Sequence, residues 1–194
     1  MVERNSDQLT LFAKGEAPEG FKYQPELLAL EDERALLQNI RQLPFKEFEF
    51  HGYTGKRRVV SFGWKYDFSA RTLREADHIP SFLLSLREIA AAFAGVAGTH
   101  LQQVFVTEYD AGAGIGWHRD KAVFGEVIGI CLLSPCTFRL RRKQGTTWER
   151  VSIRVDPRSG YLLSGPSRTE WEHSIPPVDV LRYSVTFRNL LVSR

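Results

Sequence analysis

Apolar residues in the first half of the chain recur at the spacing of an α-helix. In LEDERALLQNIRQL (30–43), four leucines and Ile40 lie near one face, and acidic residues occupy the first turn, where they complement the helix dipole. In PSFLLSLREIAAAFAGV (80–96), Pro80 suits the start of a helix and Gly95 its end. The pattern predicts two helices, over 30–43 and 80–96.

After residue 100 the hydrophobic pattern changes to short β-strands separated by Gly, Pro and Ser. RKQGTT (142–147) is short enough to join two of them as a hairpin, and RRVVSFGWKYDF (57–68) adds an earlier strand or hairpin. Close, regular spacing of strands is typical of a sandwich or barrel. The predicted fold is α+β and mainly β, with the helices on one face of a sheet. The later strands are expected at 101–109, 125–133, 136–142, 147–155, 160–165 and 182–190.

Length and composition indicate an ordinary globular protein. The chain has 194 residues, of which 43% are hydrophobic and 25% charged, so one domain over 21–194 is expected, preceded by a flexible arm over 1–20. No apolar run is long enough to span a bilayer, and MVERNSDQ lacks the apolar core of a signal peptide. We therefore predict a cytoplasmic protein, and nothing in the sequence indicates an oligomer, so a monomer is expected.

The cysteines and the charges narrow the class further. Cys131 and Cys136 form neither a disulfide framework nor a zinc cage, and they are expected to be buried thiols. The formal net charge of +3 permits a nucleic-acid partner without requiring one. Positive charge is concentrated in GKRR (55–58) and RLRRK (139–143), of which the second lies on the predicted hairpin.

The stretch GIGWHRDKAVFG (114–125) is the first candidate for chemistry. His118 and Asp120 would point the same way from a strand and reach one metal ion, and His173 is the best third ligand. Two histidines and one carboxylate leave three metal positions open, as in non-haem Fe(II) oxygenases. The pair alone is equally compatible with a surface histidine and a turn-capping aspartate.

The last strand adds an anion-binding pattern. In RYSVTFRNL (182–190), Arg182, Ser184, Thr186 and Arg188 share one face, and Tyr183, Val185 and Phe187 share the other, apolar face. If the apolar face packs on the helices, both arginines point into the β-body, where a buried charge must be paired. A dicarboxylate would meet that need, whereas two exposed arginines at a sheet edge are the alternative.

Taken together, the HxD motif, the distal histidine and RYSVTFR resemble the AlkB family of Fe(II)/2-oxoglutarate dioxygenases, over roughly Phe45 to Leu190. The resemblance implies a double-stranded β-helix (jelly roll) with N-terminal helices, a lid at about 50–75 and a body at about 100–194. It assigns His118, Asp120 and His173 as the metal ligands. The 2-oxoglutarate site by the same resemblance comprises Tyr109, Thr107, Arg182, Ser184 and Arg188, and Arg168 matches an arginine near the substrate mouth.

The chain departs from the bacterial prototype of the family at several positions. Thr107 and Ser184 stand where the prototype has asparagine, and Ala122 replaces an acidic residue that meets the base. The loop RTEWEH (168–173) is one residue longer and is more similar to members that act on RNA. The co-substrate pose and the base preference are therefore expected to differ.

The resemblance implies oxidative demethylation of alkylated bases in DNA or RNA, with Fe(II), 2-oxoglutarate and O₂ as cofactors and formaldehyde, succinate and CO₂ as products. Repair of alkylation damage is the expected role. A tRNA-modifying hydroxylase or a protein demethylase would keep this chemistry. A metal hydrolase on the same ligands leaves Arg182, Arg188 and Tyr109 unexplained, and the intact ligands disfavour a catalytically silent binding module.

Candidate substrate contacts lie outside the metal motif. SFGWKYDF (61–68) offers Phe62, Trp64, Tyr66 and Phe68 at period two, in the region of the family's lid, and Trp64 or Tyr66 is expected to stack on the base. A core-facing aromatic strand is the alternative. On the hairpin, Arg139 and Arg141 point outward if Phe138 and Leu140 point inward, and they are expected either to contact phosphate or to remain solvated.

The N-terminal motif QLTLF suggests a separate partner. It resembles the peptide by which bacterial proteins bind the replication sliding clamp, and Gln8, Leu9, Leu11 and Phe12 would form the anchor. Packing of the arm on its own domain is the alternative.

Overall fold

A computed structural model describes residues 17–50 and 53–191. Helix α1 (Leu30–Ile40) and helix α2 (Leu84–Ala94) lie where the helical spacing predicts them. A short 3₁₀ turn, Ser81–Leu83, leads into α2, and Gly95 ends it in the left-handed conformation at φ 77°. Within the described ranges, no helix has the length and apolar character needed to cross a membrane.

Two antiparallel sheets form the β-body. The major sheet has seven strands in the order β1-β11-β8-β13-β6-β3-β2, and the minor sheet has four in the order β10-β9-β12-β7. A separate two-stranded sheet pairs β4 with β5. The strands are β1 (Phe21–Gln24), β2 (Lys46–Phe50), β3 (Tyr53–Phe62), β4 (Trp64–Asp67), β5 (Thr72–Glu75), β6 (Gln103–Tyr109), β7 (Ile115–His118), β8 (Phe124–Leu132), β9 (Cys136–Gln144), β10 (Thr147–Val155), β11 (Gly160–Leu163), β12 (Glu172–Ile175) and β13 (Arg182–Leu190).

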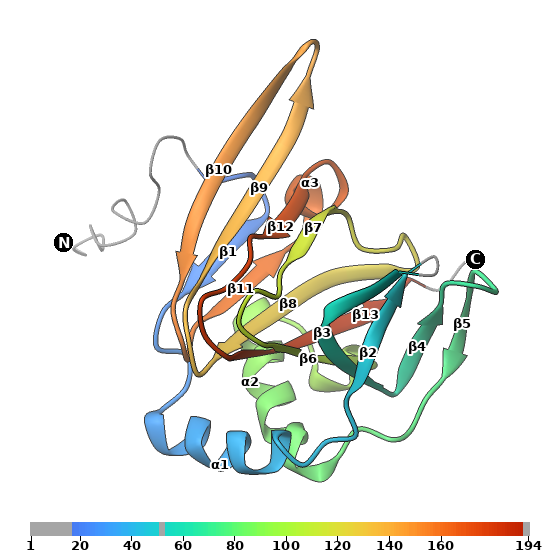
Figure 1. The fold of residues 1–194 in the computed structure, drawn as a ribbon, viewed down its shortest axis with the longest axis vertical. Helices are drawn as coiled ribbons and strands as arrows, with labels where there is room; N and C mark the ends of the chain where they lie inside the picture. Colours follow the sequence, from blue (N-terminus) through green and yellow to red (C-terminus); the bar gives the residue numbers. More distant parts are fainter. Residues whose placement is uncertain (1–16, 51–52, 192–194) are drawn as a thin grey trace.

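Strand β13 shows how the layers are built. Its Tyr183, Val185 and Phe187 are buried in an apolar cluster that α1 and α2 share with β8 and β6. The alternate positions face the minor sheet, across a second cluster that includes Phe138 of β9 and Tyr161 of β11. Figure 1 shows both helices against one side of the major sheet and the long β9–β10 hairpin extending from the body. The double-stranded β-helix with helices on one face is thereby confirmed.

The aromatic stretch 61–68 is divided by a backbone turn rather than forming one strand. Gly63 has φ 72°, so β3 ends at Phe62 and β4 begins at Trp64 in the two-stranded β4–β5 sheet, called the small sheet below. Phe62 is 5% exposed and belongs to the core. The predicted common face of Phe62 with Trp64 and Tyr66 is therefore wrong, because Gly63 redirects the chain between them.

The end of the predicted arm is part of the fold. Pro18 is buried, the carbonyl of Glu19 accepts a hydrogen bond from Ser167 N, and the carbonyl of Gly20 accepts one from Ser164 N. Residues 17–20 are thus held against the turn that follows β11. The motif QLTLF, for which a sliding-clamp contact is predicted, lies outside the described residues.

Candidate metal centre and co-substrate pocket

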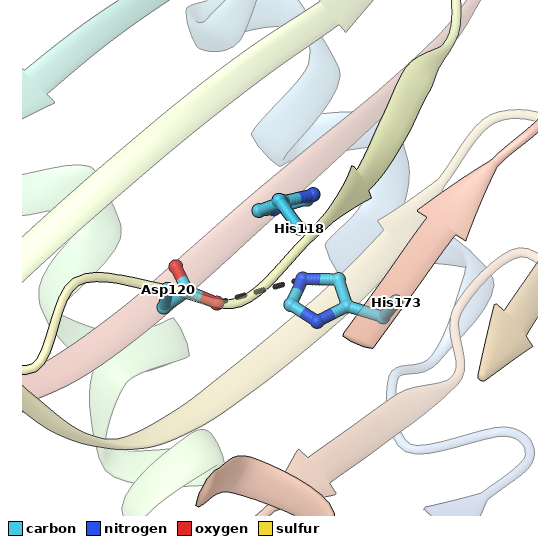
Figure 2. A group of neighbouring side chains, drawn as sticks. All are labelled: His118, Asp120 and His173. Atoms are coloured by element: carbon cyan, nitrogen blue, oxygen red, sulfur yellow. Dashed lines mark ion pairs between the residues drawn. The ribbon is translucent and has the colours of Figure 1, made fainter. Parts of the chain in front are cut away.

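The two candidate histidines lie side by side on neighbouring strands of the minor sheet. His118 ends β7, His173 lies in β12, and the two are register partners with ring centroids 4.2 Å apart. Asp120 lies two residues beyond the end of β7, so its predicted place in a strand is wrong; the loop that leaves β7 brings it to the histidines. One ligand atom from each of the three lies within 4.8 Å of the others (Figure 2). Sequence-distant residues therefore form one compact ligand set.

The surroundings hold these three groups in their metal-binding protonation states. Burial, together with the neighbouring His118, lowers the pKa of His173 to about 3. Burial also lowers the pKa of His118, although Asp120 opposes the shift. Burial disfavours a charged Asp120, but Arg188 and the two histidines outweigh it and leave the pKa of Asp120 below its ordinary value. Neutral imidazoles and an ionised carboxylate are the forms that coordinate a metal.

Outer contacts orient the ligands. His118 Nδ1 lies 2.9 Å from the carbonyl oxygen of Gly116, which can only accept, so this nitrogen carries the proton and Nε2 is left for a metal. The Nη2 of Arg188 lies 2.6 Å from Asp120 Oδ1. The other oxygen, Asp120 Oδ2, is buried and accepts no hydrogen bond, and it lies 3.5 Å from His173 Nε2. A cation bound between these atoms would satisfy Oδ2, so the donor set fits Fe(II).

Arg182 forms a second unsatisfied site deeper in the body. The side chain is 1% exposed, and its guanidinium lies 4.6 Å from the centroid of the Tyr109 ring. Nη2 donates to Cys131 Sγ at 3.4 Å, whereas Nε and Nη1 are buried without any partner. Buried guanidinium N–H groups that lack an acceptor call for an anion, and arginine suits a carboxylate. The site therefore fits the distal carboxylate of 2-oxoglutarate.

One pocket is lined by the metal ligands and by several residues that the resemblance assigns to 2-oxoglutarate. These are Arg188, Thr107, Tyr109 and Ser184, whereas Arg182 is not among the lining residues, and binding of the co-substrate by this set stays a prediction. Arg57, which was not predicted as a site residue from the sequence, also lines the pocket. Only the pairing of β3 with β6, which sets Arg57 opposite Tyr109, reveals its place. The remaining lining residues are Phe105, Ile115, His118, Asp120, Val127, Phe138, Tyr161, His173, Ile175 and Thr186.

The guanidinium of Arg168 is hydrogen-bonded to the protein backbone. The residue is 8% exposed, and its guanidinium donates to the carbonyls of Gly125, Lys121 and Phe124 at 2.7–2.8 Å. These bonds anchor the loop that follows Asp120 to helix α3 (Gly165–Thr169). The substrate contact that the resemblance implies for Arg168 stays a prediction.

Replacing Arg168 by methionine is expected to reduce the free energy of unfolding by about 2–3 kcal/mol, because three carbonyl acceptors lose a charged donor. Urea denaturation of the metal-free protein measures this. Arg119, an exposed arginine that donates to one carbonyl, that of Thr169, is the matched control, and Arg119→Met should change stability by under about 1 kcal/mol. Unchanged stability in Arg168→Met, with weaker nucleic-acid binding, would instead support the substrate contact.

The β4–β5 sheet lies beside the metal-binding loop. Lys121, next to Asp120, places Nζ 5.3 Å from the ring centroids of both Tyr66 and Phe68. Tyr66 and Phe68 contact each other edge to face at 5.2 Å. Trp64 is half-buried in the same strand as Tyr66. The structure therefore brings Tyr66 to the loop that carries Asp120, and stacking on a base stays a prediction for Trp64 and Tyr66.

The hairpin arginines lie outside the pocket. Phe138 and Leu140 are buried, as predicted, so Arg139 and Arg141 lie on the outer face of β9. Arg139 donates to Ser174 Oγ, and Arg141 forms an ion pair with Glu172 at 2.6 Å. Phosphate contact by this pair stays a prediction, and the ion pair has to be weakened for Arg141 to take part.

The cysteines also border the co-substrate site. Cys131 and Cys136 are buried free thiols, as the sequence predicts. A hydrogen bond from Cys136 and, secondarily, the charge of Arg182 lower the pKa of Cys131 despite its burial.

The double-stranded β-helix and the two-histidine, one-carboxylate centre define a non-haem Fe(II) oxygenase architecture. A family model described as the 2OG-Fe(II) oxygenase superfamily matches residues 29–188. The chain belongs to this superfamily. It is therefore a dioxygenase, and its cofactors are Fe(II), 2-oxoglutarate and O₂.

Sequence relatives support the predicted AlkB family within the superfamily. The "Alkylated DNA repair protein ALKBH8 homolog" of Arabidopsis thaliana is 30% identical over 145 residues, which cover 62% of this chain and 42% of the relative. A Mus musculus protein, "tRNA (carboxymethyluridine(34)-5-O)-methyltransferase ALKBH8", is 24% identical over 187 residues, which cover 91% of this chain and 27% of the relative. The chain spans less than half the length of these relatives.

Solved structures support the fold. The structure of OsALKBH1 matches with a TM-score of 0.69 at 14% identity, over 90% of this chain and 99% of that one. A prolyl-4-hydroxylase of Pseudomonas putida matches with a TM-score of 0.59 at 12% identity, over 90% and 94%. The same fold thus carries different substrates, and the substrate of this chain has to be argued from its own residues.

Proposed function

We propose that the protein oxidises an alkylated base in nucleic acid, releasing formaldehyde from an N-methyl group. In the overall reaction, one oxygen atom of O₂ enters the substrate as a hydroxyl group and the other enters succinate, as 2-oxoglutarate loses CO₂. Iron and 2-oxoglutarate supply this oxidation when bound. The protein holds both, positions the substrate carbon and keeps water away from the site.

The observation that carries this proposal is the contact between the metal-binding loop and the small sheet. Lys121 adjoins Asp120 and lies against the rings of Tyr66 and Phe68. A planar base that approaches the metal past Lys121 would meet the aromatic rings, and the lysine would lie near the phosphate of that nucleotide. Stacking on aromatic side chains and charge near the backbone are the usual means of holding an unpaired base.

The outer face of the minor sheet supports a nucleic-acid partner. Trp117 of β7 lies beneath the guanidinium groups of Arg139 and Arg141, at 5.0 and 4.4 Å from the ring centroid. Arg141 also lies 4.3 Å from the Trp148 centroid on β10. This alternation of arginine and tryptophan suits both phosphate and bases.

Hydroxylation of a modified tRNA base is the second candidate. The name of the mouse relative includes a modified uridine of tRNA, and the match covers 91% of this chain. This activity would use the same iron and co-substrate residues, but the hydroxylated product would be stable and no formaldehyde would form.

Assays with a panel of oligonucleotides separate the candidates. The Fe(II)-loaded protein would be given 2-oxoglutarate, air and DNA or RNA that carries N-methylated bases or modified uridines. Formaldehyde together with oligonucleotide-dependent succinate supports demethylation, and a product 16 Da heavier without formaldehyde supports hydroxylation. Succinate that no oligonucleotide stimulates would contradict both, with a peptide panel as the next substrate class.

Tyr66→Ala is expected to lower kcat/KM for the oligonucleotide by about 5–100-fold, because stacking on one aromatic contributes about 1–3 kcal/mol per base. The KM for 2-oxoglutarate should stay the same. Tyr66→Phe, which keeps the ring, is the matched control and should retain most activity. Equal kcat/KM in Tyr66→Ala and the unaltered protein would remove Tyr66 from the substrate site, and the same comparison applies to Trp64→Ala.

A further inference from the structure

Arg57 is a buried cation without an ion pair among the described side chains. The side chain is 9% exposed and lines the pocket with the metal ligands. It forms no ion pair with any residue whose side chain the structure describes. It lies opposite Tyr109 of β6, and its guanidinium carbon lies 3.9 Å from the centroid of the Phe48 ring. A buried charge without an ion pair is costly, and an anion bound in the pocket would offset that cost.

The other arginines of the region already have their counterparts. Arg188 pairs with Asp120, and Arg168 donates to three carbonyls. Arg182 has unpaired donors that fit the distal carboxylate of 2-oxoglutarate. Asp120 is also the only carboxylate among the described residues that line the pocket. Arg57 is therefore the cation left for a group that is not part of the protein.

The charge of the loaded pocket leads to the same conclusion. The two positive charges of Fe(II) equal the two negative charges of 2-oxoglutarate, and Asp120 is matched by Arg188. Arg57 in the pocket and Arg182 next to Tyr109 then leave an excess of positive charge when iron and co-substrate are both bound. An anionic group on the substrate would reduce this excess.

The position of Arg57 favours the substrate over the co-substrate. Register pairing sets Arg182, Tyr109 and Arg57 in one row across β13, β6 and β3, so Tyr109 stands between the two arginines. On its other side, Arg57 lies against Phe48, which meets Phe68 edge to face at 5.7 Å. Phe68 in turn contacts Tyr66 of the small sheet. Arg57 thus adjoins a row of aromatic rings that ends beside Lys121, the residue after Asp120.

We propose that Arg57 binds an anionic oxygen group of the target nucleotide and so makes the enzyme selective for anionic over neutral substrates. The group is a carboxylate on the base or the phosphate beside it. This inference rests on the proposed action on nucleic acid and names the part of the substrate that the pocket selects.

Binding without turnover tests this assignment directly. Protein loaded with Fe(II) and 2-oxoglutarate would be titrated anaerobically, by fluorescence anisotropy, with two matched pairs of oligoribonucleotides. The first pair carries 5-carboxymethyluridine or its methyl ester at one position. The second pair carries one N-methylated base flanked by phosphodiesters or by methylphosphonates. The first pair reports a base carboxylate, and the second reports a phosphate.

The unaltered protein is expected to bind the anionic member of one pair about 10–100-fold more tightly, as a charged hydrogen-bonded pair would provide. Arg57→Met should lose this preference, and Arg57→Lys should keep part of it. Arg58→Met is the matched control, because Arg58 is 52% exposed and pairs with Glu108 instead. It should keep the full preference.

Three outcomes would overturn the assignment. They are equal binding within both pairs by the unaltered protein, an unchanged preference in Arg57→Met, and a weaker affinity of Arg57→Met for 2-oxoglutarate with the preference intact. The last outcome would move Arg57 to the co-substrate site. Because binding is read without O₂, a lack of product in air would count against the proposed reaction and not against this subsite.

Discussion

His173→Gln is expected to lower Fe(II) affinity and kcat by more than about 100-fold, since changes to outer-shell contacts alone cost about 10–100-fold. His173 lies opposite His118 and faces Asp120, so it completes the ligand set. Glutamine fills most of the space of the imidazole, which is 8% exposed and stacks on Phe138. Equilibrium dialysis against Fe(II) under anaerobic conditions and succinate release measure the two losses.

The control for this experiment is His78→Gln, because His78 is exposed and lies outside the ligand set. It should bind iron and turn over as the unaltered protein does. A His173→Gln protein that keeps its thermal stability but loses iron identifies a ligand. Full iron binding in a folded His173→Gln protein would show that the metal is held elsewhere.

Arg182→Met is expected to raise the KM for 2-oxoglutarate by about 100-fold or more, because a buried charged pair with a carboxylate contributes about 3 kcal/mol. Whereas co-substrate binding becomes weaker, the free energy of unfolding of the protein without co-substrate should not decrease. Nε and Nη1 of Arg182 are buried without partners, so removing the charge should leave the free energy of unfolding unchanged or increase it. A buried arginine of this kind lowers the stability of the free protein because its charge is paired only when the co-substrate binds.

Thermal unfolding with and without 2-oxoglutarate separates these effects. In the unaltered protein, 2-oxoglutarate should raise Tm, and in Arg182→Met this increase should disappear at the same concentration. Arg154, which is 69% exposed on β10 and pairs with Asp156, provides the matched control Arg154→Met, which should keep the increase. A large fall in Tm with an unchanged KM would show that Arg182 serves packing rather than the co-substrate.

These two sites are joined by β13. Its residue Arg182 carries the unpaired donors expected to bind 2-oxoglutarate, and Arg188, six residues on, forms an ion pair with Asp120. The strand alternates so that its opposite side packs on the helices. A change that shifts the register of β13 would therefore affect both sites at once, whereas the two substitutions above should act separately.

Local sequence was sufficient for the helices and for most strands of the body. Helical spacing placed α1 and α2, and alternation placed β6, β8, β9, β10, β11 and β13. Strands β1, β2, β5 and β12 were not predicted, because they are short or lack a clear alternation, and β7 was expected only as the strand that carries His118. The metal ligands and the co-substrate arginines could be selected because a charged or imidazole side chain in an apolar strand region needs a partner. Their grouping around a metal followed from chemistry and family resemblance.

The tertiary structure decided the contacts of individual polar side chains. Asp120 reaches the histidines from a loop rather than a strand, and Arg168 is used by three carbonyls. Gly63 separates Phe62 from the small sheet, and strand pairing turns Arg57 toward Tyr109. The sequence by itself determined which residues must be buried, through periodicity and hydrophobicity. Only pairing between distant strands determined which partners the buried charges meet, because register and strand order are not local properties of the chain.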